Sequence, residues 1–117
     1  MNDYRLLTDE IINAKVAVAL GFDRPAFIDA VLAGEEFEGE RFDPCNSPQY
    51  AWPIAIENRI SINAHGRIYW MAWKNIGQTL MQISRPENML SETCKNPCRA
   101  ISIVFLMMKE AEMESHQ

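Results

Sequence analysis

The sequence lacks the features expected of membrane proteins and of most nucleic-acid-binding proteins. It contains no run of about 18 apolar residues, so we expect no transmembrane helix. Its 11 Lys and Arg residues are scattered with no two adjacent, and 16 Asp and Glu residues give a formal net charge of -5. Nucleic acids and anionic membranes are bound mainly through clustered positive charge. We therefore expect no direct contact with either.

Cysteine, histidine and glycine are too few, or too poorly spaced, for the familiar catalytic and metal sites. Cys94 and Cys98 lack the Cys-x-x-Cys spacing of most zinc sites, and the only other Cys or His residues are Cys45, His65 and His116. The five glycines stand singly, so no Gly-rich phosphate loop is present. We therefore expect no metal, no cofactor and no enzymatic activity.

What is present is typical of an ordinary globular chain. The 117 residues, 48% hydrophobic and 23% charged, predict one domain spanning residues 1–117. Within it we expect an irregular acidic loop at 35–50 and a frayed tail at 111–117. The first residues lack the apolar core of a signal peptide, and an odd number of cysteines fits a reducing compartment. The expected location is the cytoplasm.

Two N-terminal segments have the apolar spacing and end signals of helices. In residues 8–20, Thr8 is suited to cap the first turn and Gly21 to end the helix, with apolar side chains every three or four residues between them. Residues 25–33 begin with a proline, which suits the first helical turn, and stop at Gly34.

A third helix is predicted at residues 97–110, after Asn96 as the cap. One face of it carries the side chains Ile101, Val104, Phe105 and Met108. Cys98 lies near its start, where the helix dipole can lower the pKa of a thiol. No His–Asp pair is recognisable nearby, so we favour the simpler reading of Cys98 as a small apolar core residue.

Residues 51–83 carry the signals of β-strands. Apolar and polar side chains alternate in 51–58 and again in 59–64, with a turn predicted between them at Glu57-Asn58. Residues 67–74 are apolar on both faces, and residues 78–83 are a candidate fourth strand.

Residues 84–95 contain Arg85-Pro86 and are expected to be a loop. Strands between flanking helices predict an α+β fold. We expect an antiparallel three- to four-stranded sheet with two N-terminal helices and one C-terminal helix packed on it.

The strand at 67–74 is the segment most informative about function. Ile68, Trp70 and Ala72 continue the aliphatic pattern of the preceding strand, so we assign these three side chains to the helix-packed core. A slip of one residue in the register would exchange the two faces of the strand.

The other face of this strand then forms an outer row of Tyr69, Met71 and Trp73, beside polar residues of the neighbouring strand. Together with Trp52, the row is a candidate contact surface, because aromatic side chains are common at binding hot spots. The alternative is that both faces of the strand are buried in the core.

Three segments of the chain form a recognisable combination. They are LTDEIINAKVAVALGF (7–22), FDPCNSPQYAWPIAIENRISI (42–62) and NPCRAISIVFLMMKE (96–110), which cover 52 of the 117 residues. The middle segment is the most specific. With these segments the chain resembles the phage NinX proteins, small proteins of unknown function encoded in lambda-like phages and prophages. The resemblance implies a phage or prophage origin and action inside a bacterial cell, and it brings no activity or catalytic residue.

The leading hypothesis is a non-enzymatic phage accessory protein that binds a host macromolecule, such as a host protein. The alternative is a small-ligand protein that binds or sequesters a nucleotide-like molecule between the sheet and a loop. A small hydrolase is the least favoured reading, because nothing in the spacing of the 16 acids singles out a catalytic pair. The acidic run at 35–43 is most simply a solvated loop, although it could mimic a phosphate backbone toward a DNA-binding host protein. Whether the chain forms a homodimer is left open.

Overall fold

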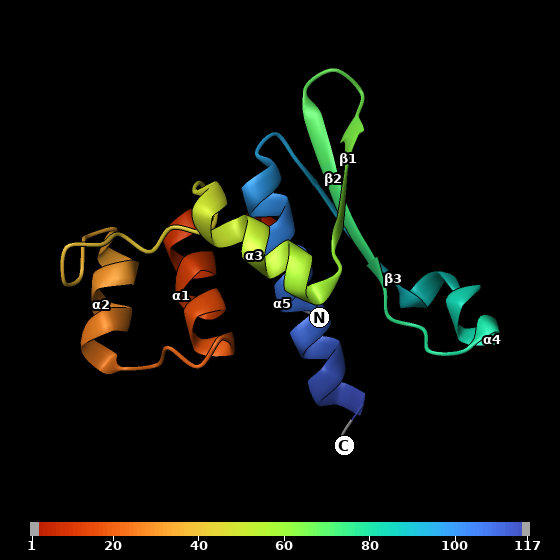
Figure 1. Ribbon diagram of the computed structural model, residues 1–117, viewed down its shortest axis with the longest axis horizontal. Coiled ribbons are helices and arrows are strands. Elements are labelled where there is room, and N and C mark those ends of the chain that lie inside the picture. The colour runs from red at the N-terminus through yellow and green to blue at the C-terminus, as the bar shows by residue number, and fades with distance from the viewer. Residues whose placement is uncertain (1–2, 116–117) are drawn as a thin grey trace.

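The computed structural model describes residues 3–115, and in it the C-terminal helix α5 (Pro97–Ser115) lies at the centre of a flat molecule of 46 × 40 × 25 Å (Figure 1). The other elements are, in chain order, a 3₁₀ turn η1 (Tyr4–Leu6), helices α1 (Asp9–Ala19), α2 (Pro25–Ala33) and α3 (Pro48–Asn58), strands β1 (Ser61–His65) and β2 (Tyr69–Asn75), helix α4 (Leu80–Ile83), a 3₁₀ turn η2 (Pro86–Asn88) and strand β3 (Met89–Cys94). The predicted α+β class is confirmed.

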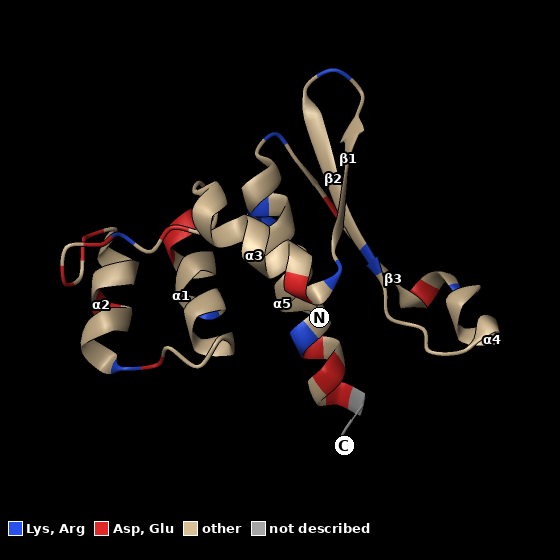
Figure 2. Cartoon of the chain, in the orientation of Figure 1, with Lys and Arg blue, Asp and Glu red and all other residues tan. Residues whose placement is uncertain are grey.

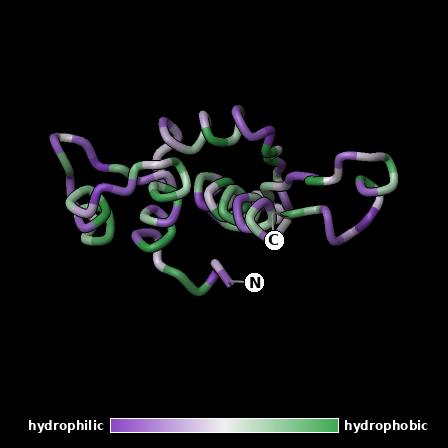
Figure 3. Tube along the Cα trace, turned by 90° about the horizontal axis from the view of Figure 1, so that it is seen from below, coloured by the Kyte–Doolittle hydropathy of each residue, from purple (hydrophilic) through white to green (hydrophobic). Residues whose placement is uncertain are grey.

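Helix α5 is surrounded by the other elements. Residues 100–106 are all buried, so this stretch is enclosed on every side and not on one face only. Strands β2 and β3 contact α5, and so do α1 and α3. Figure 3 shows the coil of α5 end-on between the N-terminal helices and the α4 segment. The helix continues to Ser115, beyond residue 110 at which the predicted helix ends, and residues 116 and 117 lie outside the described part.

The two N-terminal helices form where the sequence predicts them. The Thr8 side chain accepts a hydrogen bond from the Ile11 backbone N–H, which caps α1. Gly21 and Gly34 follow α1 and α2 with φ angles of 91° and 70°, a left-handed backbone that glycine adopts without strain. Their packing differs from the prediction, because α1 lies against α5 and α2 lies against α1, while the main helix contact of the sheet is α5.

The predicted strand at 51–58 is wrong, because this segment belongs to helix α3. Its apolar side chains fit both a period of two and a helical period, and tertiary packing decides between the two. Ala51, Ile54 and Ala55 are spaced for one helix face and are buried against the core, whereas Ile56 is 76% exposed. Arg59, with a φ angle of 54°, ends the helix where a tight strand turn was expected.

The sheet is antiparallel with the strand order β1-β2-β3. Residues 78–83 are not a fourth strand: Thr79 caps the short helix α4 by accepting a hydrogen bond from the Gln82 N–H. The third strand lies instead within 84–95, which was predicted to be a loop. It has no clean alternation of apolar residues, and its order comes from pairing with β2 and from the buried Leu90.

The inner face of the β1–β2 hairpin is only partly covered. Ala72 is fully buried against the core, as predicted, and Ile62 opposite it is half-buried. Trp70 on the same strand and Ile68 in the turn before it are 41% and 58% exposed, so their assignment to the core is wrong. The hairpin extends beyond α5 toward its turn (Figure 1), which leaves these two side chains largely uncovered by the elements of residues 3–115.

A buried hydrogen-bond network attaches the loop before α3 to α1. The Asn13 amide donates to the Asp43 carboxylate at 2.8 Å, and its carbonyl oxygen accepts the Cys45 backbone N–H at 3.0 Å. Asp9 of α1 in turn pairs with Arg99 of α5. Within the described part of the chain, no buried side-chain N or O atom lacks a hydrogen-bond partner. The network therefore fixes three chain segments with little desolvation cost.

Substitution of Val104 by Asp tests the central position of α5. Val104 is fully buried, so an aspartate there would be an unpaired buried charge and should lower the free energy of unfolding by about 3–5 kcal/mol. Val18→Asp is the matched control, since Val18 is 53% exposed on α1, and it should cost less than about 1 kcal/mol. Equal stability losses in urea denaturation would contradict the placement of the helix.

Substitution of Asn13 by Ala tests the buried network. It leaves the buried Cys45 N–H without its partner and removes one of the two side chains that donate to the Asp43 carboxylate, the other being Asn46, and should destabilise the protein by about 2–4 kcal/mol. Asn63→Ala removes an exposed hydrogen bond from the Trp73 indole and should cost less than about 1 kcal/mol. A loss for Asn13→Ala no larger than that of its control would show that the network contributes little.

Candidate functional site

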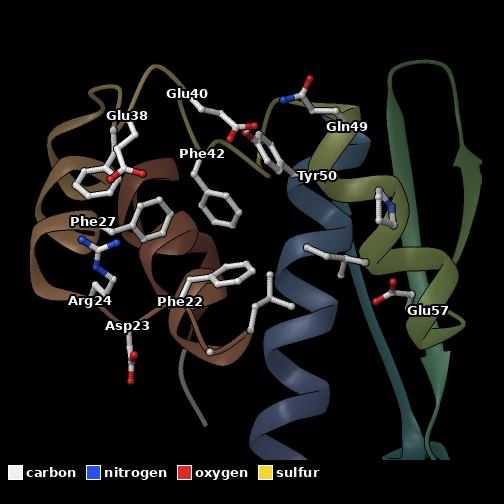
Figure 4. Close-up of a pocket in the computed structure, with 15 residues that line it drawn as sticks. Phe22, Asp23, Arg24, Phe27, Glu38, Glu40, Phe42, Gln49, Tyr50 and Glu57 are labelled. Carbon is white, nitrogen blue, oxygen red and sulfur yellow. Dashed lines mark hydrogen bonds between the residues drawn. The ribbon is translucent and has the colours of Figure 1, made fainter.

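A cavity of about 690 Å³ opens between the N-terminal helices and α3 (Figure 4). Its walls come from three parts of the chain: the α1–α2 junction with the start of α2, the acidic loop at 35–47, and one side of α3. The volume lies within the range of about 300–1,000 Å³ that is typical of ligand pockets.

The cavity is lined mainly by aromatic side chains. Phe42 lies at the centre of a cluster in which Phe22, Phe27 and Tyr50 have ring centroids 6.4, 5.7 and 4.9 Å from its own. Phe37 packs edge-on against Phe27 at 5.6 Å. Phe42 is buried, whereas Phe22 at the mouth is 53% exposed. Steeply tilted rings leave some ring faces turned to the cavity, where they can contact a bound group.

Carboxylates dominate the rim of this cavity. Asp23, Glu38, Glu40 and Glu57 lie at its edge, against Arg24 as the one lining cation. Figure 2 shows that acidic residues are concentrated in the loop beside α2 and also toward the C-terminal end of α5. The site therefore has an apolar interior and a negatively charged entrance.

Tyr50 connects the interior to the rim. Its hydroxyl donates a hydrogen bond to the Glu40 carboxylate, and the two side chains point toward each other in Figure 4. Partial burial, reinforced by this hydrogen bond, raises the pKa of Tyr50 above its ordinary value. The hydrogen bond holds the acidic loop against α3.

The predicted outer row lies together on one face of β2. Trp73 pairs with Ser61, Met71 with Asn63 and Tyr69 with His65, so the row lies beside polar residues of β1, as expected. Met71 and Trp73 are half-buried, Tyr69 is 41% exposed, and the Trp73 indole donates to Asn63 at 2.7 Å. The row is thus a shallow surface, not a cavity.

Trp52 is not part of that row, because it belongs to α3 and not to a strand. It is 42% exposed on the same helix side as Ile56, four residues later. The structure therefore separates Trp52 from the three side chains with which the sequence grouped it.

The cysteines do not form a reactive or metal-binding group. Burial is the main cause that raises the pKa of Cys45, Cys94 and Cys98, which opposes any lowering by the helix dipole at Cys98. In residues 3–115, no three or more His, Cys, Asp or Glu side chains are grouped so that they could hold a metal ion. His116 lies outside these residues.

The sequence did not identify the aromatic cavity, although one signal was present. Four of the five phenylalanines lie between residues 22 and 42. Their convergence depends on how α2 and the acidic loop fold back toward α3, which no local pattern encodes.

The raised thiol pKa values predict slow labelling of the native protein. Because little thiolate is present, Ellman's reagent at pH 8 should react at least about tenfold more slowly with the native than with the urea-unfolded protein. Cys94, the least buried of the three by residue exposure, should react first. The native rate should still rise above pH 9. Rapid labelling at pH 6 would instead indicate an activated thiol and a nucleophilic role.

Comparisons with known proteins identify the family of the chain. No curated protein and no solved structure was found to match it. None of the helices in the described residues is long and apolar enough to cross a membrane. The family described as Bacteriophage P22, NinX matches residues 3–109, which include the aromatic cavity, the sheet and most of α5. The chain therefore belongs to the phage NinX family.

Proposed function

We propose that this phage accessory protein acts inside the host cell by binding a host protein, and that it is not an enzyme. The observation that carries the proposal is the aromatic cavity with its acidic rim. Such a cavity has the exposed apolar area and the concave shape that favour specific binding. Its side chains offer no recognisable pair of nucleophile and base.

The charge of the rim separates the candidate ligands. Four carboxylates against one guanidinium repel the phosphates of nucleic acids and of nucleotides. A nucleotide-like small ligand, the second candidate function, is therefore disfavoured, although the volume of the cavity would accommodate one. A protein surface can present cationic and apolar groups together, which fits the cavity better.

The outer row of Tyr69, Met71 and Trp73 is a weaker candidate for the primary contact. Two of its three side chains are already half-buried, and the Trp73 indole is hydrogen-bonded within the sheet. Binding there would gain less apolar area than binding in the cavity. We therefore assign the row a secondary role in partner contact.

A host-lysate capture experiment tests the proposal. The tagged protein should recover a host protein in near-equal amounts, and Phe22→Ala should abolish the recovery, because Phe22 lies at the mouth of the cavity. Since this side chain is 53% exposed, the substitution should leave the melting temperature within a few degrees of wild type.

Leu80→Ala is the matched control. Leu80 is 87% exposed on α4, away from the cavity lining, and its loss should leave capture unchanged. Undiminished capture by Phe22→Ala would exclude the cavity as the contact. A metabolite that co-purifies and is seen by native mass spectrometry, with no protein partner, would favour the small-ligand function.

A further inference from the structure

The aromatic cavity contains a feature that indicates what kind of group it receives. The Arg24 guanidinium lies 5.4 Å from the centroid of the Phe37 ring, over the ring face. This is a cation–π contact within the cavity lining itself, and it forms between a cation and one of the clustered rings. The aromatic wall therefore already accommodates one positive charge next to a ring face.

The rim has more negative charge than Arg24 balances. Glu38, Glu40 and Glu57 lie around the opening, and Asp23 lies at its edge with its carboxylate turned outward (Figure 4). No ion pair joins any of these four to a Lys or Arg side chain within residues 3–115. Glu40 has a neutral partner in the Tyr50 hydroxyl. A negative entrance above aromatic rings is complementary to a group that is both cationic and partly apolar.

Resting on the proposed function, we propose that the cavity binds a basic segment of the partner protein. One Lys or Arg side chain enters the cavity, and its alkyl stem packs on the exposed surface of the ring cluster formed by Phe22, Phe27 and Phe42. Neighbouring basic side chains of the segment pair with the carboxylates at the rim. Lys and Arg suit this position because they combine an apolar stem with a charged head.

Other occupants fit less well. A nucleotide or an acidic peptide would place negative charge beside the rim carboxylates. A purely apolar segment would fill the cavity but would leave the rim charges partly desolvated and unpaired. A second copy of this chain carries a net charge of -5 and has no two adjacent basic residues, so it lacks a concentrated basic segment to donate.

The test uses defined peptides with the purified full-length protein. Three fluorescein-labelled peptides share the same apolar residues and differ at the remaining positions. The basic peptide carries Lys and Arg there, the neutral peptide Gln, and the acidic peptide Glu. Fluorescence anisotropy should show binding of the basic peptide at least about tenfold tighter than of the neutral one, and no binding of the acidic one. Raising the salt concentration should lower the affinity for the basic peptide more than the affinity for the neutral peptide.

Two triple variants distinguish the effect of the rim carboxylates on affinity from the effect of the net charge of the protein. The rim variant Glu38→Gln, Glu40→Gln, Glu57→Gln should lose about tenfold in affinity for the basic peptide. The control variant Asp29→Asn, Glu87→Gln, Glu114→Gln removes the same number of charges from exposed positions outside the lining, and should change the affinity less than about twofold. Equal losses in the two variants would overturn the proposal, because only net charge would then matter.

Phe22→Ala should also lower the affinity for the basic peptide. This result would show that the peptide with the preferred charge binds at the aromatic cavity. Equal binding of the basic and neutral peptides would overturn the inference, and so would tetramethylammonium binding as tightly as the basic peptide. A concentration-dependent dimer that Phe22→Ala dissociates would assign the cavity to a second copy and overturn it as well.

The inference and the proposed function can fail separately. Host-protein capture that depends on Phe22, combined with peptides that show no charge preference, would refute the basic occupant and leave the function standing. Selective binding of the basic peptide without any captured host protein would support the basic occupant and count against the function in the host.

Discussion

Helix α5 is enclosed over residues 100–106, and a helix that is apolar on every side is stable in water only when other elements surround it. This constraint places the rest of the chain. The sheet contacts α5 through β2 and β3, while α1 and α3 contact it as helices. Helix α2 packs mainly on α1, so it stands one layer away from the core. The aromatic cavity opens where this outer layer and α3 do not meet.

The polar network before α3 determines how that opening is shaped. Asn13 holds the Asp43–Cys45 turn against α1, and Arg99 joins α1 to α5 through Asp9. Buried polar groups of this kind stabilise little in net terms, but they are costly to break, so they specify one arrangement among several compact ones. With the turn fixed, Phe42 points into the aromatic cluster. A binding site on an otherwise irregular loop is thereby built on a rigid support.

The parts of the structure that could be predicted from sequence are those with local causes. Thr8 marks the start of α1 through its side-chain hydroxyl, and Gly21 and Gly34 mark helix ends through their backbone freedom. Alternation predicts which side chains share a face of the β1–β2 hairpin. The apolar side chains of residues 51–58 fit both the period of a strand and that of a helix, and packing against α5 selects the helix. Strand β3 has no pattern of its own and is ordered by its partner. The candidate site was missed for the same reason, because its rings converge only after α2 and α3 are placed.

The acidic residues around the cavity connect solubility with recognition. A cluster of partly exposed phenylalanines would promote nonspecific association if its surroundings were neutral. Carboxylates at the rim oppose that, since they repel other copies of an acidic protein and remain hydrated while the cavity is empty. The same charges attract a basic surface and weaken binding of an acidic one. The physical device that keeps the exposed rings soluble is therefore also the one that selects what can cover them.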